Sequence, residues 1–554
     1  MIYWQMKLFK KYYFWILFVI MAVYYGYRMF FLTPWYDELY TYYYFISKGP
    51  LYAAIHWPLP NNHVGYSVLS ACFDFLGNAY IGLRGVSYLC ALVNMYLIYR
   101  IAGKYMKEQM AFATVILYIS MNLVNQLAVQ GRGYTLGITC FLTAWFCLIQ
   151  ICTLKQPGKR FYFVYAAALV LGLYTVSSNV YWVVPLCLAG GCYLLICGIS
   201  ESRNKTLSVR KTEGISRLIK LILASLSAAL ATILLYMTIW VSIGSNLLVK
   251  DETESYYGMG HVQMILKAPF KAIQKGMEYM LATPYIQSEE RAGFAGRLFQ
   301  WIVTLAGYYY NSLSTLLLIV LGIGTVFLIY RIMKKIRQEN NVNLLLNLVL
   351  LLEIILIPVF LLIQCKRPYY RVFTYGGVLA AMLLGVLLGE AAEYFKSKLP
   401  KGKNGIYVVL LLLITVFGVK CIFFSDYNNQ YGLNEYEIQD AFAHGDMENR
   451  ENFCVTDCNQ EYLLYFLYGI RCENRNIEGA DVVLLDKRMA DPDFDEMVWE
   501  FYFYYDSIPW DYIGQNMELT YENENYILYT KNKLKMRLVS APQPQAEKYK
   551  AAQK

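Results

Sequence analysis

The chain has few charged residues for its length. Of 554 residues, only 16% are Asp, Glu, Lys or Arg, whereas 57% are hydrophobic. Soluble domains carry about 25% charged residues, so this composition excludes an ordinary soluble domain and predicts a membrane protein. The net charge of +9 is spread in short clusters, and no long basic run is present. The charge pattern therefore argues against nucleic acid as a partner.

Patterns typical of metal clusters are also missing. The sequence has only four His, which are scattered, and no pair of CxxC motifs. Most of the 13 Cys lie in apolar runs, where we interpret them as small buried hydrophobic residues. The polar C-terminal part contains Cys454, Cys458 and Cys472, and a disulfide between two of them is left open.

No signal-peptide cleavage site follows the first apolar segment. This segment runs from about 12 to 31, follows Lys7, Lys10 and Lys11, and is too long for a signal-peptide core. We therefore expect a retained anchor with a cytoplasmic N-terminus.

Long apolar runs are what the chain has instead. A span needs roughly 20 apolar residues, and on this rule we count about eleven. The expected spans are 12–31, 80–101, 110–129, 134–153, 161–176, 180–199, 218–245, 302–330, 343–364, 372–391 and 405–424. The predicted fold class is thus mainly α, a polytopic transmembrane helical bundle.

The distribution of Lys and Arg fixes the expected orientation. With a cytoplasmic N-terminus, the basic clusters fall on the inner connections, and few cations fall on the short outer ones. An odd number of spans then places the C-terminus outside. We therefore expect a multi-pass cell-membrane protein with an extracytoplasmic C-terminal domain.

Three regions follow from these expectations. Residues 1–424 form the transmembrane domain, 425–540 a small α/β domain, and 541–554 a disordered tail. The first outer loop, 32–79, contains two short apolar stretches that fit interfacial helices, Leu39–Lys48 and Val64–Leu76. In the C-terminal domain we expect strands at 453–456, 482–485 and 526–529, with helices at 435–443, 460–468 and 493–504.

An adjacent acidic pair, Asp37 and Glu38, lies at the start of the first outer loop. Its neighbours Pro34-Trp35-Tyr36 and Leu39-Tyr40 favour burial rather than solvation. A carboxylate placed near a lipid phosphate can act as general base for an acceptor hydroxyl or hold a divalent cation. The alternative is an ordinary solvated pair in a loop.

Basic and His residues form a second group of candidates on the outer side. Arginine binds phosphate through its planar fork, so a lipid phosphate would explain cations on this side of the membrane. Headgroup contact or snorkelling is the alternative. A polar turn with two His precedes the second interfacial stretch, and structural packing of either His is equally consistent. These candidates are His56, His63, Arg84, Arg132, Arg367 and Arg371.

One further ionisable residue, Glu353, lies in the middle of the ninth expected span. A proton-relay role and a hydrogen bond to a neighbouring helix are both consistent with this position.

The sequence resembles the C-type glycosyltransferase superfamily. Within it, the chain is similar to dolichyl-phosphate-mannose:protein mannosyltransferases and aminoarabinose transferases. The matching motifs are Asp37-Glu38, His63 with Tyr66, Leu83-Arg84, and Gln130-Gly131-Arg132-Gly133-Tyr134. Val64 and Gly65 replace the two prolines that usually follow the His. The C-terminal domain carries no motif of the family.

The resemblance implies transfer of a sugar from a polyprenyl-phosphate donor to a lipid, glycan or protein acceptor on the outer face. Asp37 would deprotonate the acceptor hydroxyl, with inversion at the anomeric carbon, and Glu38 would assist. Arginines would offset the charge on the leaving phosphate. His63, Tyr66 and Tyr134 would complete the substrate site, to which the polar turn before the second interfacial stretch adds His56. No nucleotide-sugar-binding domain is needed, because the donor arrives in the membrane; no cofactor is established, and a divalent metal on Asp37, Glu38 and His63 is left open.

Two other functions stay under consideration. A transporter or lipid flippase would place ionisable residues through the midplane on broken helices, whereas in this chain most lie at the outer ends. A surface-polymer ligase or polymerase with a different active-site loop is the third class.

Overall fold

The structure is a computed structural model. It describes residues 2–55, 61–205, 212–249, 266–335, 342–398, 405–424, 435–444, 450–472, 476–491 and 502–531. Its contacts divide the chain into two units. The first, which we call the membrane unit, comprises Met1–Leu32 and Tyr44–Tyr427, and the second comprises Thr33–Tyr43 and Asn428–Lys554.

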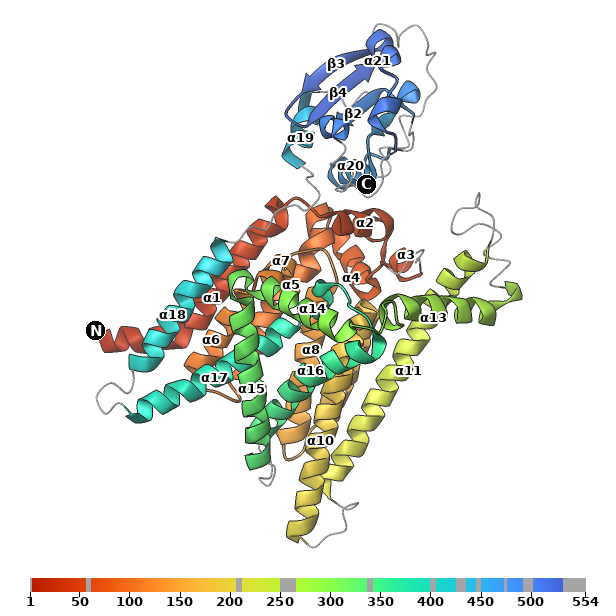
Figure 1. Cartoon of the computed structure of the whole chain (residues 1–554). Coiled ribbons are helices and arrows are strands. Elements are labelled where there is room, and N and C mark those ends of the chain that lie inside the picture. The colour runs from red at the N-terminus through yellow and green to blue at the C-terminus, as the bar shows by residue number, and fades with distance from the viewer. Residues whose placement is uncertain are drawn as a thin grey trace. The chain divides into compact units, whose positions relative to one another are not determined.

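The membrane unit is a bundle of helices (Figure 1). Among the described residues, nine helices are long and apolar enough to cross a membrane. They are α1 (Ile2–Phe31), α5 (Ala79–Ala102), α8 (Tyr134–Thr153), α10 (Val180–Lys205), α11 (Glu213–Leu248), α15 (Ser314–Lys335), α16 (Val342–Gln364), α17 (Gly376–Lys398) and α18 (Gly405–Phe423). The predicted polytopic helical fold is thereby confirmed.

Two further predicted spans are shorter helices. The segment expected at 110–129 is broken into α6 (Glu108–Ile119) and α7 (Asn122–Leu127), and the one at 161–176 is the 17-residue α9 (Lys159–Thr175). The segment expected at 302–330 is also two helices, since α14 (Phe294–Tyr309) ends before α15 begins. At this break the Tyr310 hydroxyl donates to the carbonyl of Leu117, 2.7 Å away.

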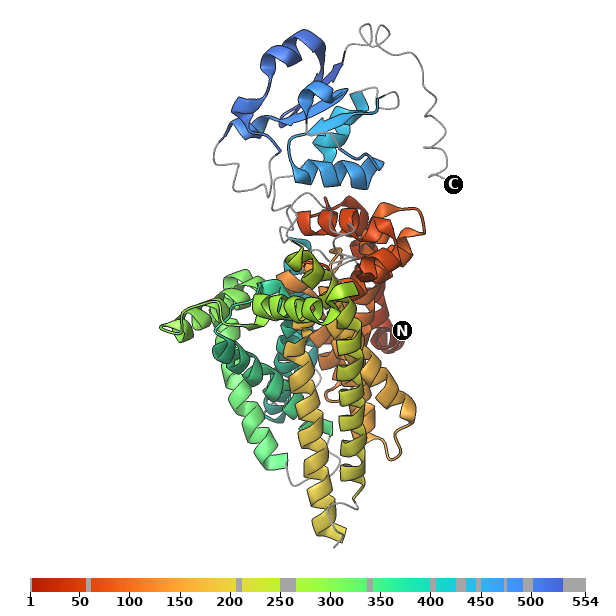
Figure 2. The same ribbon diagram turned by 90° about the vertical axis from the view of Figure 1, so that its right-hand side faces the viewer.

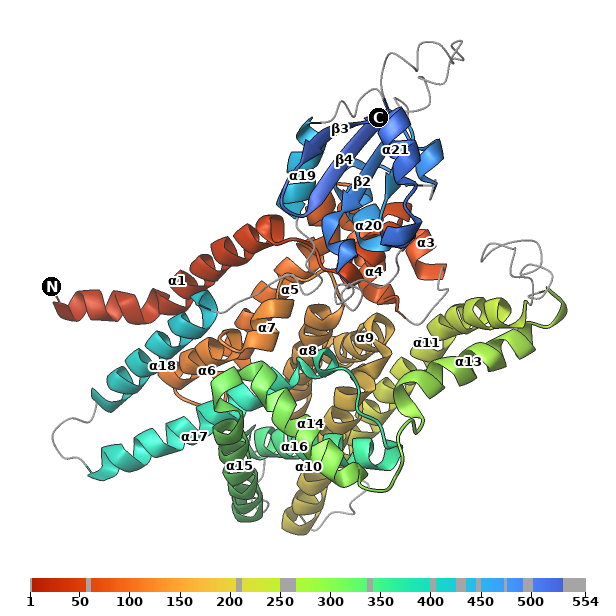
Figure 3. The ribbon, with the colours of Figure 1, turned by 45° about the horizontal axis from the view of Figure 1, so that its top comes forward.

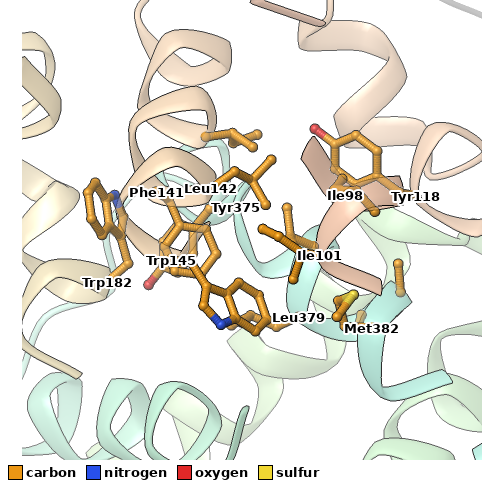
Figure 4. Close-up of a cluster of buried hydrophobic side chains, with 14 of the residues drawn as sticks. Ile98, Ile101, Tyr118, Phe141, Leu142, Trp145, Trp182, Tyr375, Leu379 and Met382 are labelled. Atoms are coloured by element: carbon orange, nitrogen blue, oxygen red, sulfur yellow. The ribbon is translucent and has the colours of Figure 1, made fainter. Parts of the chain in front are cut away.

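A continuous apolar core joins the helices of the membrane unit. Figure 4 shows part of it, where aromatic side chains of α8 and α10 meet Tyr375 and aliphatic side chains of α5 and α17. Phe141, Trp145 and Trp182 are fully buried there. Burying aromatic side chains of this size contributes strongly to core packing.

Most of the described residues between 246 and 301, which connect the seventh and eighth expected spans, are helical. After α11, the chain continues with α13 (Pro269–Tyr285), which packs along α11. Glycines permit this close approach, because a Cβ on Gly244 would lie 1.7 Å from the Ala272 carbonyl oxygen and one on Gly276 2.0 Å from that of Trp240. On its other side α11 runs beside α10, as the yellow and gold helices of Figure 2 show.

The segment expected to form the first outer loop folds into short helices, as predicted. They are α2 (Tyr36–Tyr44), α3 (Pro50–Ile55) and α4 (Val64–Asp74). Helix α4 packs against α3 and α5 within the membrane unit. By contrast, most of α2 groups with the second unit.

The C-terminal domain, residues 435–531, is the predicted small α/β domain. Its sheet has the order β1-β2-β4-β3, with β1 parallel to β2 and the other neighbours antiparallel. Helix α19 packs against β3 and β4, and α20 against β1 (Figure 3). The strands are β1 (Phe453–Val455), β2 (Val482–Asp486), β3 (Met517–Glu522) and β4 (Tyr526–Lys531), and the helices are α19 (Glu435–His444), α20 (Cys458–Tyr468) and α21 (Trp510–Asn516).

Some features of this domain were not predicted, and some predicted features lie outside the described residues. Strand β3 was not predicted. The helix expected at 493–504 and the tail at 541–554 fall mostly or wholly outside the described residues. The structure contains no disulfide among the described cysteines, Cys454, Cys458 and Cys472 included.

Asp457 links β1 to α20 as the N-cap of the helix. Its carboxylate accepts hydrogen bonds from the backbone N–H groups of Asn459 at 2.7 Å and Gln460 at 3.1 Å. Burial raises the pKa of Asp457 to about 7, and the neighbouring Asp486 adds to the effect although the two N–H groups and Arg488 oppose it. The folded domain therefore holds a proton here that the unfolded chain releases near its ordinary value of 3.8.

We expect Asp457→Asn to flatten the pH dependence of the stability of this domain. Because the folded pKa is raised, wild-type stability falls as pH increases from about 4 to 7 and stays low above that. Asn keeps the cap without a charge, so the variant should be more stable than wild type at pH 8 and no more stable at pH 5. Hydrogen exchange of the α20 amides in the full chain, corrected for intrinsic rates, measures this. An equal difference at both pH values would contradict it.

Candidate functional site

His63 lies at the N-cap of α4 and is buried. Its Nδ1 accepts a hydrogen bond from the backbone N–H of Gly133, 2.9 Å away, so Nδ1 carries no proton. Burial lowers the pKa of His63 well below its ordinary value, and the nearby Arg132 and Arg371 lower it further. The imidazole is therefore neutral, and its proton is on Nε2.

Arg132 faces this imidazole from the segment between α7 and α8. Its Nη2 donates to the Asn61 side-chain oxygen at 2.7 Å and lies 3.4 Å from His63 Nε2. The hydrogen bond from Gly133 fixes the tautomer of His63. Arg132 Nη2 and His63 Nε2 are therefore both donors and do not hydrogen-bond to each other. An oxygen that accepts from both N–H groups fits this arrangement, and an anionic oxygen fits best beside a guanidinium.

Two glycines allow the Arg132 segment to pack this closely. A Cβ on Gly133 would lie 2.5 Å from Thr175 Cγ2 and 3.2 Å from His63 Cβ. A Cβ on Gly131 would lie 2.5 Å from Leu83 Cδ1. The Gly-Arg-Gly sequence thus brings the backbone against both the imidazole and α5, because these positions have no room for a side chain.

Tyr134 and Arg371 complete this group. Arg371, in the 3₁₀ turn Tyr370–Phe373, donates from Nε to the Tyr134 hydroxyl at 3.0 Å, and its guanidinium lies 4.6 Å from the ring centre of Tyr369. The Tyr134 ring packs edge-on against His63, with 4.9 Å between ring centres. We call His63, Arg132, Tyr134 and Arg371 the arginine cluster. It brings two cations and a neutral imidazole together from three distant parts of the sequence.

Arg84 and Tyr66 make contacts other than those that join the four members of the arginine cluster. Arg84 is buried, and its Nη1 donates to the carbonyls of Met29 at 3.1 Å and Leu32 at 2.6 Å. A cation at the C-terminal end of α1 stabilises the helix dipole and its last carbonyls. Substrate contact by Arg84 stays a prediction.

The Tyr66 hydroxyl joins α4 to α5. It donates to the carbonyl of Leu83 at 2.6 Å and lies 3.1 Å from the Ser87 hydroxyl oxygen. Ser87 donates to the carbonyl of Gln130 at 2.6 Å. Tyr66 therefore supports the segment that carries Arg132, and any direct substrate contact stays a prediction.

Arg367 and His56 are not members of the arginine cluster. The Arg367 side chain is partly exposed and forms an ion pair with Glu289, whose oxygens lie 2.8 and 3.0 Å from its Nε. His56 lies outside the described residues. Sequence reasoning did not single out Asn61 or Tyr369, although Asn61 lies two residues before His63 and Tyr369 two before Arg371.

Asp37 and Glu38 occupy the first turn of α2, in the second unit. Glu38 is buried, and its carboxylate accepts from the backbone N–H of Trp35 at 2.9 Å, which is the return hydrogen bond of a capping box. Glu38 thus fixes the start of the helix. The adjacent Asp37 carboxylate also lies near the positive end of the helix dipole, which stabilises a negative charge there.

No metal-binding group of three or more His, Cys, Asp or Glu side chains is found among the described residues. Asp37 and Glu38 belong to one unit and His63 to the other, so the metal site that includes all three stays a prediction.

Glu353 is completely buried in α16, and within the described part of the chain neither carboxylate oxygen has a hydrogen-bond partner. Of the two alternatives considered for Glu353, the hydrogen bond to a neighbouring helix is thus not observed there. An uncompensated charge is costly at this position.

A family model described as dolichyl-phosphate-mannose-protein mannosyltransferase matches residues 64–227. The matched region begins one residue after His63 and includes Arg132 and Tyr134. A search of curated proteins finds no match.

Solved structures with a similar fold include ArnT from Cupriavidus metallidurans bound to undecaprenyl phosphate. It is 12% identical with a TM-score of 0.51, over 96% of this chain and 100% of that chain. ArnT in the apo state gives 11% identity and a TM-score of 0.47, over 95% and 99% of the two chains. The oligosaccharyltransferase AglB from Archaeoglobus fulgidus, in complex with an inhibitory peptide and a dolichol-phosphate, is 10% identical with a TM-score of 0.44. The match covers 88% of this chain and 71% of that chain.

The match to ArnT extends over nearly the whole of both chains, and the family match includes Arg132 and Tyr134 of the arginine cluster. The resemblance inferred from the sequence is thereby confirmed: residues 64–227 match the dolichyl-phosphate-mannose-protein mannosyltransferase family model, and the chain shares the fold of ArnT.

Proposed function

We propose that the chain is an inverting glycosyltransferase of the cell membrane. It transfers a sugar, a hexose or a pentose, from a polyprenyl-phosphate donor to a hydroxyl group on a lipid, glycan or protein acceptor. The N-terminus lies in the cytoplasm, and the reaction takes place on the extracytoplasmic face, where the C-terminal domain also lies. This orientation rests on the distribution of Lys and Arg along the sequence.

The observation that carries the proposal is the arginine cluster. Two arginines face the neutral imidazole of His63. The donors His63 Nε2 and Arg132 Nη2 lie 3.4 Å apart. A phosphate oxygen satisfies both donors, and the second guanidinium offsets a further part of its charge. The fold of a protein crystallised with undecaprenyl phosphate supports the same ligand class.

In the proposed reaction, Asp37 takes the proton from the acceptor hydroxyl. The acceptor oxygen then attacks the anomeric carbon opposite the phosphate, the bond from this carbon to the phosphate oxygen breaks, and the configuration inverts. Arg132 and Arg371 stabilise the negative charge that develops on the leaving polyprenyl phosphate. Glu38 supports Asp37 by fixing the first turn of α2.

The full-length protein in vesicles tests this proposal. The vesicles contain undecaprenyl phosphate linked to a radiolabelled sugar, and host membranes supply the acceptors. We expect label to move to an acceptor fraction while undecaprenyl phosphate is released. Movement of intact, labelled lipid between leaflets without release would instead show a flippase. Absence of both would overturn the proposal.

A further inference from the structure

Helix α2 carries the acidic pair, and its other side chains pack against the C-terminal domain. The Tyr462 ring, on α20, has three tyrosines of α2 around it, with 4.7 Å between its centre and that of Tyr43. The centres of Tyr36 and Tyr40 lie 6.2 and 6.1 Å away. Each of these distances falls within the range of favourable aromatic contact.

A second set of contacts extends this packing along α20. Tyr43 packs edge-on against Tyr465 at 4.9 Å, and Tyr42 edge-on against Phe466 at 5.0 Å. Tyr465 is also covered by the guanidinium of Arg471, 5.2 Å from the ring centre. The interface is therefore a continuous aromatic surface rather than a single contact.

A buried carboxylate anchors the same interface. Glu461 accepts a hydrogen bond from the Tyr43 hydroxyl at 2.7 Å through one oxygen and from the Tyr502 hydroxyl through the other. Both phenols donate to the carboxyl group of one side chain, so a single residue receives a hydrogen bond from each segment. Glu461 thus connects α2 to two separate segments of the C-terminal domain.

We propose that the C-terminal domain positions the catalytic base, with Tyr462 and Glu461 of α20 as positioning residues for Asp37. This inference rests on the proposed function of Asp37. It assigns a role to a domain that carries no motif of the family: α20 fixes the helix on which Asp37 stands. A displacement of about 1 Å in a reacting group can reduce the rate about 100-fold, so the aromatic packing should control the rate of transfer.

The test compares Tyr462→Ala with Tyr462→Phe in the full-length protein. Tyr462→Ala removes the ring that contacts α2, and we expect at least a tenfold lower kcat with an unchanged KM for the donor, because the arginine cluster is untouched. Tyr462→Phe keeps the ring and should retain most of the kcat. Tyr43→Phe, which alters α2 alone, removes one hydrogen bond to Glu461 and should lower kcat about threefold to tenfold.

Tyr468→Ala is the matched control. Tyr468 is on the same helix but stacks on Phe442 of the C-terminal domain, 5.5 Å between ring centres. It should perturb the domain without a selective effect on α2. Hydrogen exchange separates the two cases: amides of residues 36–43 should exchange faster in Tyr462→Ala and unchanged in Tyr468→Ala, while β2 and β4 stay protected in both.

The exchange measurement decides the packing even if the proposed function fails. Unchanged exchange at 36–43 in Tyr462→Ala would overturn the inference. Faster exchange at 36–43 in Tyr462→Ala with an unchanged kcat would also overturn it, because the packing of α2 would then have no effect on the rate of transfer. If wild type transfers no sugar while exchange responds as expected, the proposed function and the positioning role fail but the packing stands.

Discussion

Replacement of Asp37 by Asn is expected to lower kcat for sugar transfer by about 10²- to 10⁴-fold, the range that a general base contributes. Asn has the same shape as Asp but cannot take the proton of the acceptor hydroxyl. Binding of the donor lipid should stay the same, because the proposed phosphate contacts come from the arginine cluster. Transfer from an undecaprenyl-phosphate sugar and binding of the same lipid, measured on the same preparation, check the two parts.

Glu38→Gln provides the matched control at the neighbouring carboxylate. Its amide oxygen can still accept from the Trp35 N–H, so the capping hydrogen bond and the helix start are kept. We expect a much smaller loss than for Asp37→Asn. If Asp37→Asn is correctly inserted and transfers sugar at the wild-type rate, Asp37 is not the base. If Asp37→Asn and Glu38→Gln lose activity equally, the assignment of Asp37 as the base and Glu38 as its supporting residue is wrong.

Replacement of Arg132 by Gln is the second change with a large expected effect. It removes the guanidinium that faces His63 Nε2, and we expect kcat/KM for the donor to fall about 10²- to 10³-fold, as for the loss of one donor to a developing anion. Arg132→Lys keeps the charge but loses the planar fork, so an intermediate loss is expected. Steady-state kinetics with varied donor concentration measure both variants.

Arg297→Gln serves as the control for loss of a cation in the membrane unit. Arg297 is partly exposed and pairs with Glu289 at 3.3 Å. Exposed ion pairs contribute about 0–1 kcal/mol, so this variant should transfer sugar at nearly the wild-type rate. Equal losses for Arg297→Gln and Arg132→Gln would indicate a general effect of charge and would contradict the phosphate-binding role of the arginine cluster.

The bundle was predictable because membrane spans leave a strong local signal. An apolar run of about 20 residues identifies a span without knowledge of its neighbours. The same signal fails at short interruptions, since Tyr310 and Asn311 lie in an apolar region and yet separate α14 from α15. Strand β3 was missed for a related reason. Most of its residues are not buried, so its sequence lacks a clear apolar face.

The members of the arginine cluster could be predicted as candidates from the sequence. Which of the candidate arginines lie together could not be predicted. The chemistry of phosphate binding selects Arg84, Arg132, Arg367 and Arg371 equally. Only tertiary contacts distinguish them, since Arg132 and Arg371 lie around His63, whereas Arg84 hydrogen-bonds to the end of α1 and Arg367 pairs with Glu289. No local pattern contains this information, because the contacting residues are 52 to 78 positions apart for the last two.

The hydrogen bond between Tyr43 and Glu461 joins residues 418 positions apart. A ribosome adds about 5–20 residues per second, so roughly 20 to 80 s separate the synthesis of these two side chains. During that interval the acidic pair has already been made, while the helix against which α2 packs has not. On the proposed function, sugar transfer should therefore begin only after the C-terminal domain has been made and has folded against α2, so that chains without this domain stay inactive.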